Sequence, residues 1–311
     1  MNDHDMLSRR TIVSALAGAP LLIAQDPVIR VDVQLVNVTF SVRNKQGALV
    51  GNLTRDDFTI FEDGKPQPIS RFHRDTDLPL TIGLLIDISG SMYNVIETGR
   101  RAAGEFFRKV LREKDLAFVI TFGSELELMQ DLTGSKRALE KSLSEVRGQR
   151  PMRVMTQGPI PTTSRGTRLF DAVYLAAEEK LKNETGRKLI VLLTDGDDQG
   201  SVYKPAEALK QAHLSDAVIY SFFYYEPMYG SNEGALKRLS GDTGGRVFDV
   251  ARRGGLDHAF DQLQEEMRSQ YTIAYTPGGG KLDGAFRKVE IKPRDSNMKV
   301  QARRGYYPAG A

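Results

Sequence analysis

An aspartate and two serines follow an apolar run in the stretch LTIGLLIDISGSMYN, residues 80–94. Asp87, Ser89 and Ser91 stand at alternate positions, and all three side chains end in oxygen atoms. Such oxygens are the ligands that hard divalent cations prefer in proteins. Asp, Ser and Gly also form ordinary turns, so this stretch by itself fits either a turn or a metal site.

Two later stretches carry the same kind of side chain. A second apolar run ends at Asp195 in KLIVLLTDGDDQGS, and SRGTRLFDAV places Thr167 at the start of an expected helix. Ligands of parallel α/β sheets bind beyond the carboxyl ends of the strands, which is where Asp87 and Asp195 would both project, beside Ser89 and Ser91. Two carboxylates and three hydroxyls suit octahedral Mg²⁺ best, although Mn²⁺ or Ca²⁺ also accept these donors.

The elements that must position these residues begin near residue 78. From there, apolar strands alternate with amphipathic helices, which predicts a doubly wound α/β domain with a mostly parallel sheet flanked by helices. The expected strands are 80–86, 116–122, 189–194, 217–223 and 246–250. The expected helices lie near 94–112, 135–147, 167–184, 204–214, 232–240 and 255–269.

Strand-like alternation also marks both flanks of this α/β domain. Residues 28–77 alternate apolar and polar positions and contain the turn sequences NKQG and EDGK. Residues 270–308 contain three further strand-like stretches, QYTIAYTP, FRKVEIKP and MKVQARRGYY. Because about 45 residues rarely bury enough apolar surface alone, we expect the flanks to pair as one small β-sandwich-like domain, with residues 78–269 inserted between them. The alternative is two separate flaps packed on the α/β domain.

The composition excludes several kinds of chemistry and partner. The chain has 311 residues and no cysteine, which rules out disulfides and thiolate metal sites, and its 4 histidines lack the spacing of a zinc pair. Its 43 basic and 40 acidic residues give a net charge of +3. This balance argues against a nucleic acid or an anionic membrane surface as the partner.

Residues 1–24 are similar to an export signal. Arg9 and Arg10 precede a short apolar run at 12–24, too short for a stable anchor, since crossing a bilayer takes about 20 residues. The arginine pair resembles a twin-arginine signal, although Ile12 and Val13 replace its usual bulky pair, and a Sec signal is the alternative. We expect an exported protein, periplasmic or secreted, with no transmembrane anchor in the mature chain.

The three motifs together resemble the von Willebrand factor type A (vWA) domain family. The resemblance covers residues 78–269 and rests on D-x-S-x-S after a strand, G-T-x-L-x-D-A at a helix start and T-D-G at a strand end. The flanks are similar to those of exported bacterial vWA-domain proteins common in acidobacteria, a group without an assigned ligand. A Rossmann-like fold is therefore implied for the central domain.

In that family the pattern forms a metal-ion-dependent adhesion site (MIDAS). The resemblance implies that Ser89, Ser91 and Thr167 bind the cation through their hydroxyls. It also implies that Asp87 and Asp195 reach the cation mostly through waters, or through hydrogen bonds to those hydroxyls. All five positions of the pattern are filled in this chain.

The expected function is metal-dependent binding of a partner protein that presents an Asp or Glu to the cation. We do not expect an enzyme, because the three loops hold no histidine or lysine as a base or phosphate clamp, and Ser89 stands where a phosphatase has a second acid. A Mg²⁺-assisted hydrolase and a purely structural ion are the alternatives. The residues indicate no particular oligomeric state.

Two further features lie next to these motifs. Asp197 and Asp198 follow Asp195 on the same loop, where they would form a solvated turn or repel an unsuitable anion. Residues 148–166 form a long stretch rich in proline and glycine that ends one residue before Thr167. Long loops without regular structure are usually functional or disordered, and we expect this one to shape partner choice.

Overall fold

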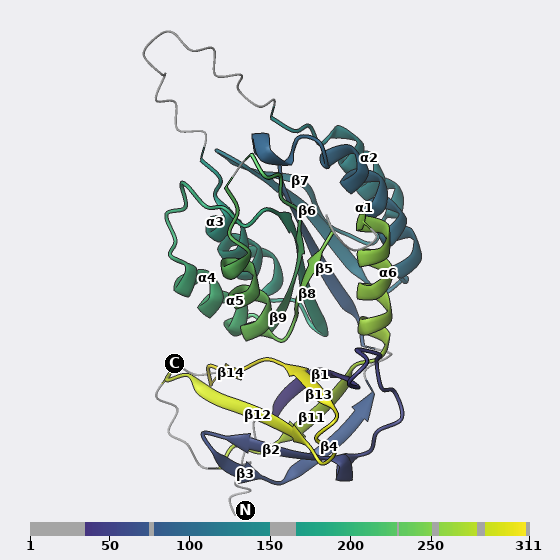
Figure 1. The fold of residues 1–311 in the computed structure, drawn as a ribbon, viewed down its shortest axis with the longest axis vertical. Helices are drawn as coiled ribbons and strands as arrows, with labels where there is room; N and C mark the ends of the chain where they lie inside the picture. The colour runs from purple at the N-terminus through teal and green to yellow at the C-terminus, as the bar shows by residue number, and fades with distance from the viewer. Residues whose placement is uncertain are drawn as a thin grey trace, which may run out of the picture. The chain divides into compact units, whose positions relative to one another are not determined.

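The computed structural model describes most of the chain, and the described residues all lie in one compact unit, Gln34–Ala311 (Figure 1). The described ranges are 35–74, 78–149, 166–228, 230–250, 255–278 and 284–308. The expected export signal at 1–24, the strand expected before residue 35 and most of the 148–166 loop lie outside these ranges, and remain predictions. Within the described ranges, no helix combines the length and the apolar character that crossing a bilayer requires.

A six-stranded sheet forms the central layer of the α/β domain, in the order β10-β9-β8-β5-β6-β7. Its strands are β5 (Leu80–Asp87), β6 (Leu116–Phe122), β7 (Leu126–Thr133), β8 (Arg187–Thr194), β9 (Ala217–Phe223) and β10 (Val247–Asp249). All neighbours are parallel except β6 and β7. The mostly parallel sheet confirms the predicted fold class, whereas the sequence analysis missed β7, a half-exposed edge strand with polar residues on both sides.

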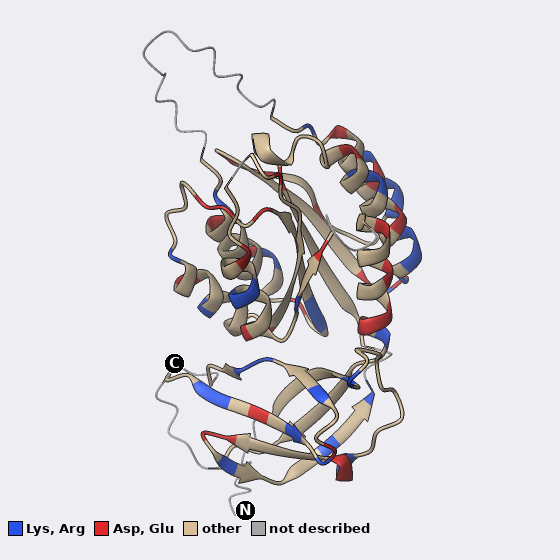
Figure 2. Ribbon diagram, viewed as in Figure 1, with Lys and Arg blue, Asp and Glu red and all other residues tan. Residues whose placement is uncertain are grey.

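Helices cover both faces of this sheet, which is why β5 is buried along its whole length. The helices are α1 (Ile96–Val110), α2 (Lys136–Glu145), α3 (Leu169–Leu175), α4 (Pro205–Leu214), α5 (Glu233–Thr243) and α6 (Gly255–Arg268). A π-helical segment, η3 (Ala176–Leu181), continues α3. One apolar cluster joins α1, α2 and α6 to the sheet, and a second joins α3, α4 and α5 to its other face (Figure 1). Positions occupied by Lys, Arg, Asp or Glu are frequent along α1, α2 and α6 (Figure 2).

Two four-stranded antiparallel sheets form the flanking β domain, in the orders β13-β1-β11-β4 and β14-β12-β2-β3. Strands of the first flank are β1 (Val36–Arg43), β2 (Phe58–Glu62), β3 (Lys65–Gln67) and β4 (Ile69–Arg74). Strands of the second flank are β11 (Tyr271–Tyr275), β12 (Arg287–Pro293), β13 (Lys299–Ala302) and β14 (Gly305–Tyr306). Each sheet therefore combines strands of both flanks, as predicted. The stretch expected to give one last strand gives two, β13 and β14, because residues 303–304 interrupt it.

Local sequence explains the turns and the core of the β domain. Asp63 and Gly64 both have positive φ angles, 48° and 79°, so EDGK forms the predicted hairpin turn between β2 and β3. The inner faces of the two sheets share one apolar cluster that includes Val38, Phe40 and Ile273. Strand pairing and this shared core hold the two flanks together.

A buried acid links the two flanks inside this core. Glu62 on β2 is 7% exposed, and its Oε2 accepts hydrogen bonds from the Tyr275 hydroxyl at 2.6 Å and from the Tyr306 hydroxyl at 2.9 Å. Burial and the hydrogen bond to Glu62 raise the pKa values of both phenols above their usual range. Both tyrosines therefore stay protonated as donors, and they fix strands from the second flank to a strand from the first.

Removal of the second flank should unfold the first flank and spare the α/β domain. In a chain of residues 25–269, β1 lacks both of its neighbours, β11 and β13, and β2 lacks β12. We expect amides of β1 and β2 to lose hydrogen-exchange protection, while β5 and β8 of the same chain, the internal control, keep theirs. Unchanged protection in β1 and β2 would contradict the shared core.

His213, on α4, is a buried base. It is 6% exposed, and its ring centroid lies 5.3 Å from that of Phe286 and 6.3 Å from that of Tyr307. Burial, and then the charge of Arg303, lower the pKa of His213 to about 4, while Asp216 acts in the opposite direction. The folded chain therefore holds His213 neutral.

This neutral histidine should make the folded state acid-sensitive. The unfolded chain takes up the proton near pH 6.5 and the folded chain only near pH 4, so falling pH favours unfolding across that window. At the lower end of this pH window, the neutral His213 reduces the free energy of unfolding by an amount on the order of 3 kcal/mol. Denaturant unfolding from pH 7 to pH 4 should show a shallower loss of stability in His213→Gln than in the wild type. His258→Gln, which removes an exposed histidine, should keep the wild-type slope, and equal slopes in all three proteins would disprove the assignment.

Candidate metal centre

Parallel alignment of β5 and β8 brings two acids to one edge of the sheet. Ile86 pairs with Leu193, so Asp87 ends β5 where Thr194 ends β8, and Asp195 follows directly. Both carboxylates are buried, with Asp87 0% and Asp195 2% exposed. The strand registers thus place both predicted acids at the carboxyl edge.

Hydrogen bonds join these acids to the predicted serines. Oδ1 of Asp87 accepts from the Ser89 backbone N–H at 2.9 Å, and its Oδ2 accepts from the Thr194 hydroxyl at 2.7 Å. The hydroxyls of Ser89 and Ser91 lie 3.0 Å apart, and Ser91 also hydrogen-bonds the Asp195 carboxylate. Four of the five predicted site residues therefore form one connected cluster.

The electrostatics of this cluster are unfavourable to two negative charges. Burial, and then the charge of Asp195, raise the pKa of Asp87 to about 7, against a usual value of 3.8. Burial also raises the pKa of Asp195. Across the described residues, no Lys, Arg or His forms an ion pair with either acid. Two buried carboxylates with no ion-pair partner among the described residues are the environment that a bound cation would stabilise.

Backbone hydrogen bonds hold Thr167 at the carboxyl edge of the sheet. Its carbonyl oxygen accepts from the Gln199 N–H at 2.9 Å, which ties it to the loop after β8. The next residue, Arg168, donates its N–H to the Gly123 oxygen at 3.1 Å, at the end of β6. Thr167 is 7% exposed. Its hydroxyl makes no hydrogen bond to the part of the chain that is described, which leaves this oxygen available as a ligand.

The sequence analysis assigned no supporting role to three residues that stabilise the site. Thr194, the first residue of the T-D-G motif, orients Asp87. Gly196 has a φ of 80°, and a Cβ there would lie 2.5 Å from the Asn232 oxygen, so this turn requires glycine. Asp198 accepts from the Phe170 N–H at 3.2 Å and therefore caps α3, a role that neither expectation for it included.

The donor set fits a hard divalent cation. The five predicted ligands offer side-chain oxygens, two carboxylates from Asp87 and Asp195 and three hydroxyls from Ser89, Ser91 and Thr167. Among the described residues, no three His, Cys, Asp or Glu side chains gather as a metal site would require. A cation held here would therefore depend on the hydroxyls of Ser89, Ser91 and Thr167 for part of its shell.

Several solved structures are similar to this chain at low sequence identity. BatB from Bacteroides thetaiotaomicron is 16% identical with a TM-score of 0.46, over 60% of this chain and 97% of that chain. The PilB minor pilin from Streptococcus sanguinis is 12% identical with a TM-score of 0.44, over 63% and 62%. Proximal thread matrix protein 1 from the mussel byssus, with a zinc-occupied MIDAS motif, is 14% identical with a TM-score of 0.50, over 66% and 49%.

A family model that matches the sequence of this chain shows its family. None of the curated proteins matches this chain. The model of the von Willebrand factor type A domain matches residues 81–262, which is more than half of the chain and includes all five predicted ligands. This match agrees with the resemblance in the three motifs and with the parallel sheet. The chain therefore belongs to the von Willebrand factor type A domain family.

Proposed function

We propose that this protein is a divalent-metal-dependent protein-binding module of the adhesion type. Its metal site consists of Asp87, Ser89, Ser91, Thr167 and Asp195, and Mg²⁺ suits these oxygens best, with Mn²⁺ or Ca²⁺ as possible substitutes. The observation that carries the proposal is the pair of buried carboxylates, hydrogen-bonded to serine hydroxyls and without an ion-pair partner among the described residues.

The residues of this chain orient the ligand oxygens. Asp87 accepts from the Ser89 N–H and from Thr194, which fixes the start of the loop that carries both serines. The Ser91 side chain hydrogen-bonds to the carboxylate of Asp195. A bound divalent cation would supply positive charge at this edge, and an Asp or Glu of a partner protein would complete its shell. The zinc-occupied MIDAS motif of the mussel byssus protein supports this use of the fold.

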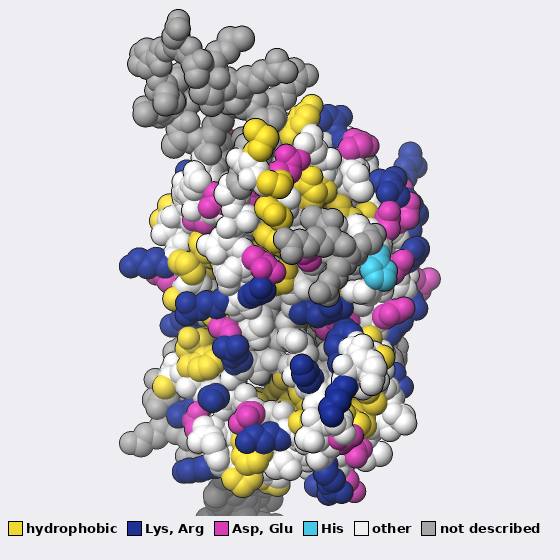
Figure 3. Space-filling view, viewed as in Figure 1, with side chains coloured by type: hydrophobic (Ala, Val, Ile, Leu, Met, Phe, Trp, Pro, Cys, Tyr) yellow, Lys and Arg dark blue, Asp and Glu magenta, His cyan; other side chains and the backbone are white. Residues whose placement is uncertain are grey.

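Exposed apolar side chains on the neighbouring loops fit a protein partner. Tyr93, Val202 and Met228 are 42%, 80% and 90% exposed, and they lie on the loops that follow β5, β8 and β9. Asn94 and Glu226 hydrogen-bond at 2.5 Å, which links the first of these loops to the third. Hydrophobic side chains also gather on the upper part of the face in Figure 3. Apolar contacts around one charged anchor are typical of specific protein interfaces.

Hydrolysis is the less favoured use of this site. A Mg²⁺-assisted phosphoesterase needs a base and a phosphate clamp, and no Lys, Arg or His pairs with Asp87 or Asp195 in the described ranges. Turnover of generic phosphoesters by the purified, Mg²⁺-loaded protein would overturn the binding proposal. A structural ion would instead raise thermal stability without any partner binding.

We also propose that the protein acts after export, in the periplasm or outside the cell. The support is the basic and apolar sequence of residues 1–24 and the similarity of the flanks to exported bacterial vWA proteins. Fractionation of cells expressing the full chain tests this, and a product confined to the cytoplasm with residues 1–24 intact would contradict it.

Asp87→Ala should abolish divalent-cation binding. Asp87 lies at the centre of the cluster and orients Ser89, so its loss removes both a charge and the loop geometry. Calorimetric titration with Mg²⁺ and Mn²⁺ should show binding in the wild type and none in the variant. Asp131→Ala is the matched control, because it removes an exposed acid that pairs with Lys180. Unchanged affinity in Asp87→Ala would reject the metal site.

Thr167→Ala should weaken partner binding more than it weakens folding. Its hydroxyl is one ligand among several, and the backbone bond to Gln199 survives the substitution. A pull-down from the native envelope, in Mg²⁺ and in EDTA, first identifies a metal-dependent partner, and we then expect roughly tenfold lower affinity in the variant. Ser142→Ala, which removes a buried hydroxyl of α2, controls for lost packing. Equal partner affinity in the wild type and Thr167→Ala would count against the bridging role.

A further inference from the structure

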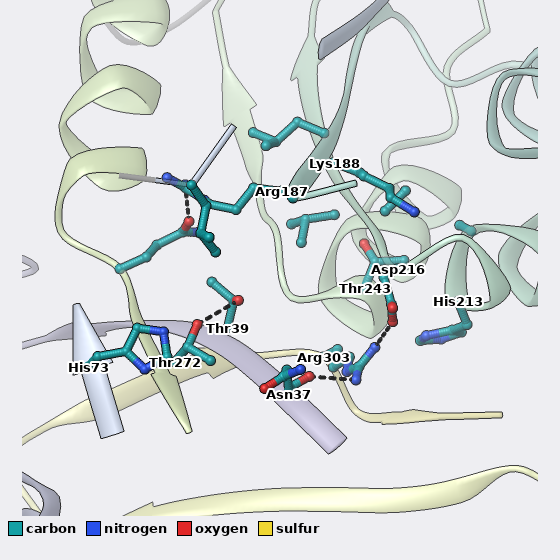
Figure 4. A pocket seen from close by; sticks show the side chains of 17 residues that line it. Asn37, Thr39, His73, Arg187, Lys188, His213, Asp216, Thr243, Thr272 and Arg303 are labelled. Carbon is teal, nitrogen blue, oxygen red and sulfur yellow. Dashed lines mark hydrogen bonds and ion pairs between the residues drawn. The ribbon is translucent and has the colours of Figure 1, made fainter. Parts of the chain in front are cut away.

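A cavity of about 340 Å³ lies at the edge of the six-stranded sheet opposite the metal site (Figure 4). Arg187 and Lys188, the first residues of β8, line it, so it lies roughly 20 Å along the strand from Thr194. Thr39 of β1 and Thr272 of β11 line it from the β domain. The cavity is therefore bounded by both parts of the described structure and is separate from the site described above.

Basic side chains outnumber acidic ones among the described residues that line this cavity. These residues include Arg187, Lys188 and Arg303, with Asp216 as the only carboxylate of the described lining. Asp216 is already engaged, because Nη1 of Arg303 pairs with it while Nη2 donates to the Asn37 oxygen at 2.7 Å. In Figure 3, Lys and Arg side chains are numerous across the middle of the face shown. The ammonium of Lys188 is the lining charge to which an anion would add a counter-charge.

Lys188 is the lining residue best suited to contact an anion. Its ammonium forms no ion pair with any carboxylate in the described ranges, and its one hydrogen bond is a long one, 3.5 Å from Nζ to the Lys182 oxygen. Burial lowers the pKa of Lys188, although the charges of Asp216 and Glu184 act in the opposite direction. A partly desolvated ammonium with such a weak partner is a ready binding group for an oxyanion.

Neutral hydrogen-bonding groups accompany these charges. The hydroxyls of Thr39 and Thr272 lie 2.9 Å apart, and the Gln270 amide donates to the Tyr220 hydroxyl at 3.2 Å. Arg187 donates to the Gln270 amide oxygen, which fixes its guanidinium beside the cavity (Figure 4). Charged groups held by neutral ones, in a cavity near the lower size limit of ligand sites, suit a small molecule.

The carboxyl ends of nearby helices are an alternative explanation for the basic side chains in this cavity. α4 ends at Leu214 and α5 at Thr243, and the carboxyl end of a helix carries about half a negative charge. Arg303 lies close to the end of α5, since it forms a β-bridge with Thr243. The Nζ of Lys188 bonds instead to Lys182, next to η3, and only weakly. Helix ends therefore explain Arg303 better than they explain Lys188.

We propose that this cavity binds a small molecule bearing a carboxylate or phosphate group. Lys188 contacts the oxyanion, and the hydroxyls of Thr39 and Thr272 line the same cavity. A ligand there would contact residues of the α/β sheet and of the β domain together. Its binding would consequently stabilise the junction between β8 and the strands β1 and β11.

Calorimetry on the full chain tests the proposal with inorganic phosphate and succinate as probes. The protein is first stripped of metal and dialysed free of chelator, so that the metal site cannot hold either anion. We expect saturable binding of at least one probe at one site per chain, and at least a tenfold loss in Lys188→Met, whose side chain keeps the apolar stem. Lys237→Met, which removes a lysine paired with Glu233 on α5, should bind as the wild type does.

Two further variants make the outcome decisive. Asp87→Ala should retain anion binding, because that residue lies at the other edge of the sheet. Lys188→Gln repeats the test if Lys188→Met melts at a lower temperature than the wild type. The proposal is overturned if the wild type binds neither probe saturably, if Lys237→Met loses as much affinity as Lys188→Met, or if Asp87→Ala abolishes binding. Preference for phosphate over succinate, or the reverse, supports the site and identifies its ligand class.

Discussion

The burial of Asp87 and Asp195 side by side is the constraint on which the candidate site depends. Carboxylates avoid the protein interior unless hydrogen bonds or cations stabilise their charge, and these two are 0% and 2% exposed. The parallel pairing of β5 and β8 forces them together, since adjacent parallel strands end at the same edge. Thr194 and the two serines supply hydrogen bonds but no positive charge. Two buried carboxylates with hydrogen bonds alone are less stable than the same pair with a bound cation, so the arrangement favours cation binding.

Another buried acid, Glu266, connects the β domain to the α/β domain. Glu266 on α6 is 0% exposed and accepts from Arg43 of β1 at 2.6 Å, from Arg246 at 2.8 Å and from Ser41 at 3.2 Å. Here the charge is satisfied by two guanidinium groups, in contrast to the acids of the metal site. The helix that ends the α/β domain is thus held to the first strand of the β domain, so the inserted domain and its host form a continuous structure.

Charged residues lie at both edges of the six-stranded sheet. Asp87 ends β5 and Asp195 follows β8 at the carboxyl edge, whereas Arg187 and Lys188 begin β8 at the amino edge. The chain direction of a parallel sheet brings these residues together, because all strand ends of one kind collect at one edge. One strand therefore contributes to a candidate cation site at one end and to a candidate anion site at the other.

The sequence alone determined the class of the fold and the identity of the candidate ligands. Strand and helix periodicity located the elements from β5 to α6, because packing on both faces of a sheet leaves long apolar runs. The motif spacing singled out Asp87, Ser89 and Asp195, since residues after strand ends meet at one edge. The sequence analysis did not predict the polar edge strand β7, because half-exposed strands lack that apolar signal.

Only the tertiary structure decided which distant residues share an environment. The bond from Thr194 to Asp87 spans 107 positions, and the cavity beside Lys188 joins strands separated by the whole inserted domain. Asp198 caps α3, which depends on how the loop after β8 folds back. Periodicity reports local burial, whereas charge balance and ligand geometry arise from side chains that meet only when the sheets close.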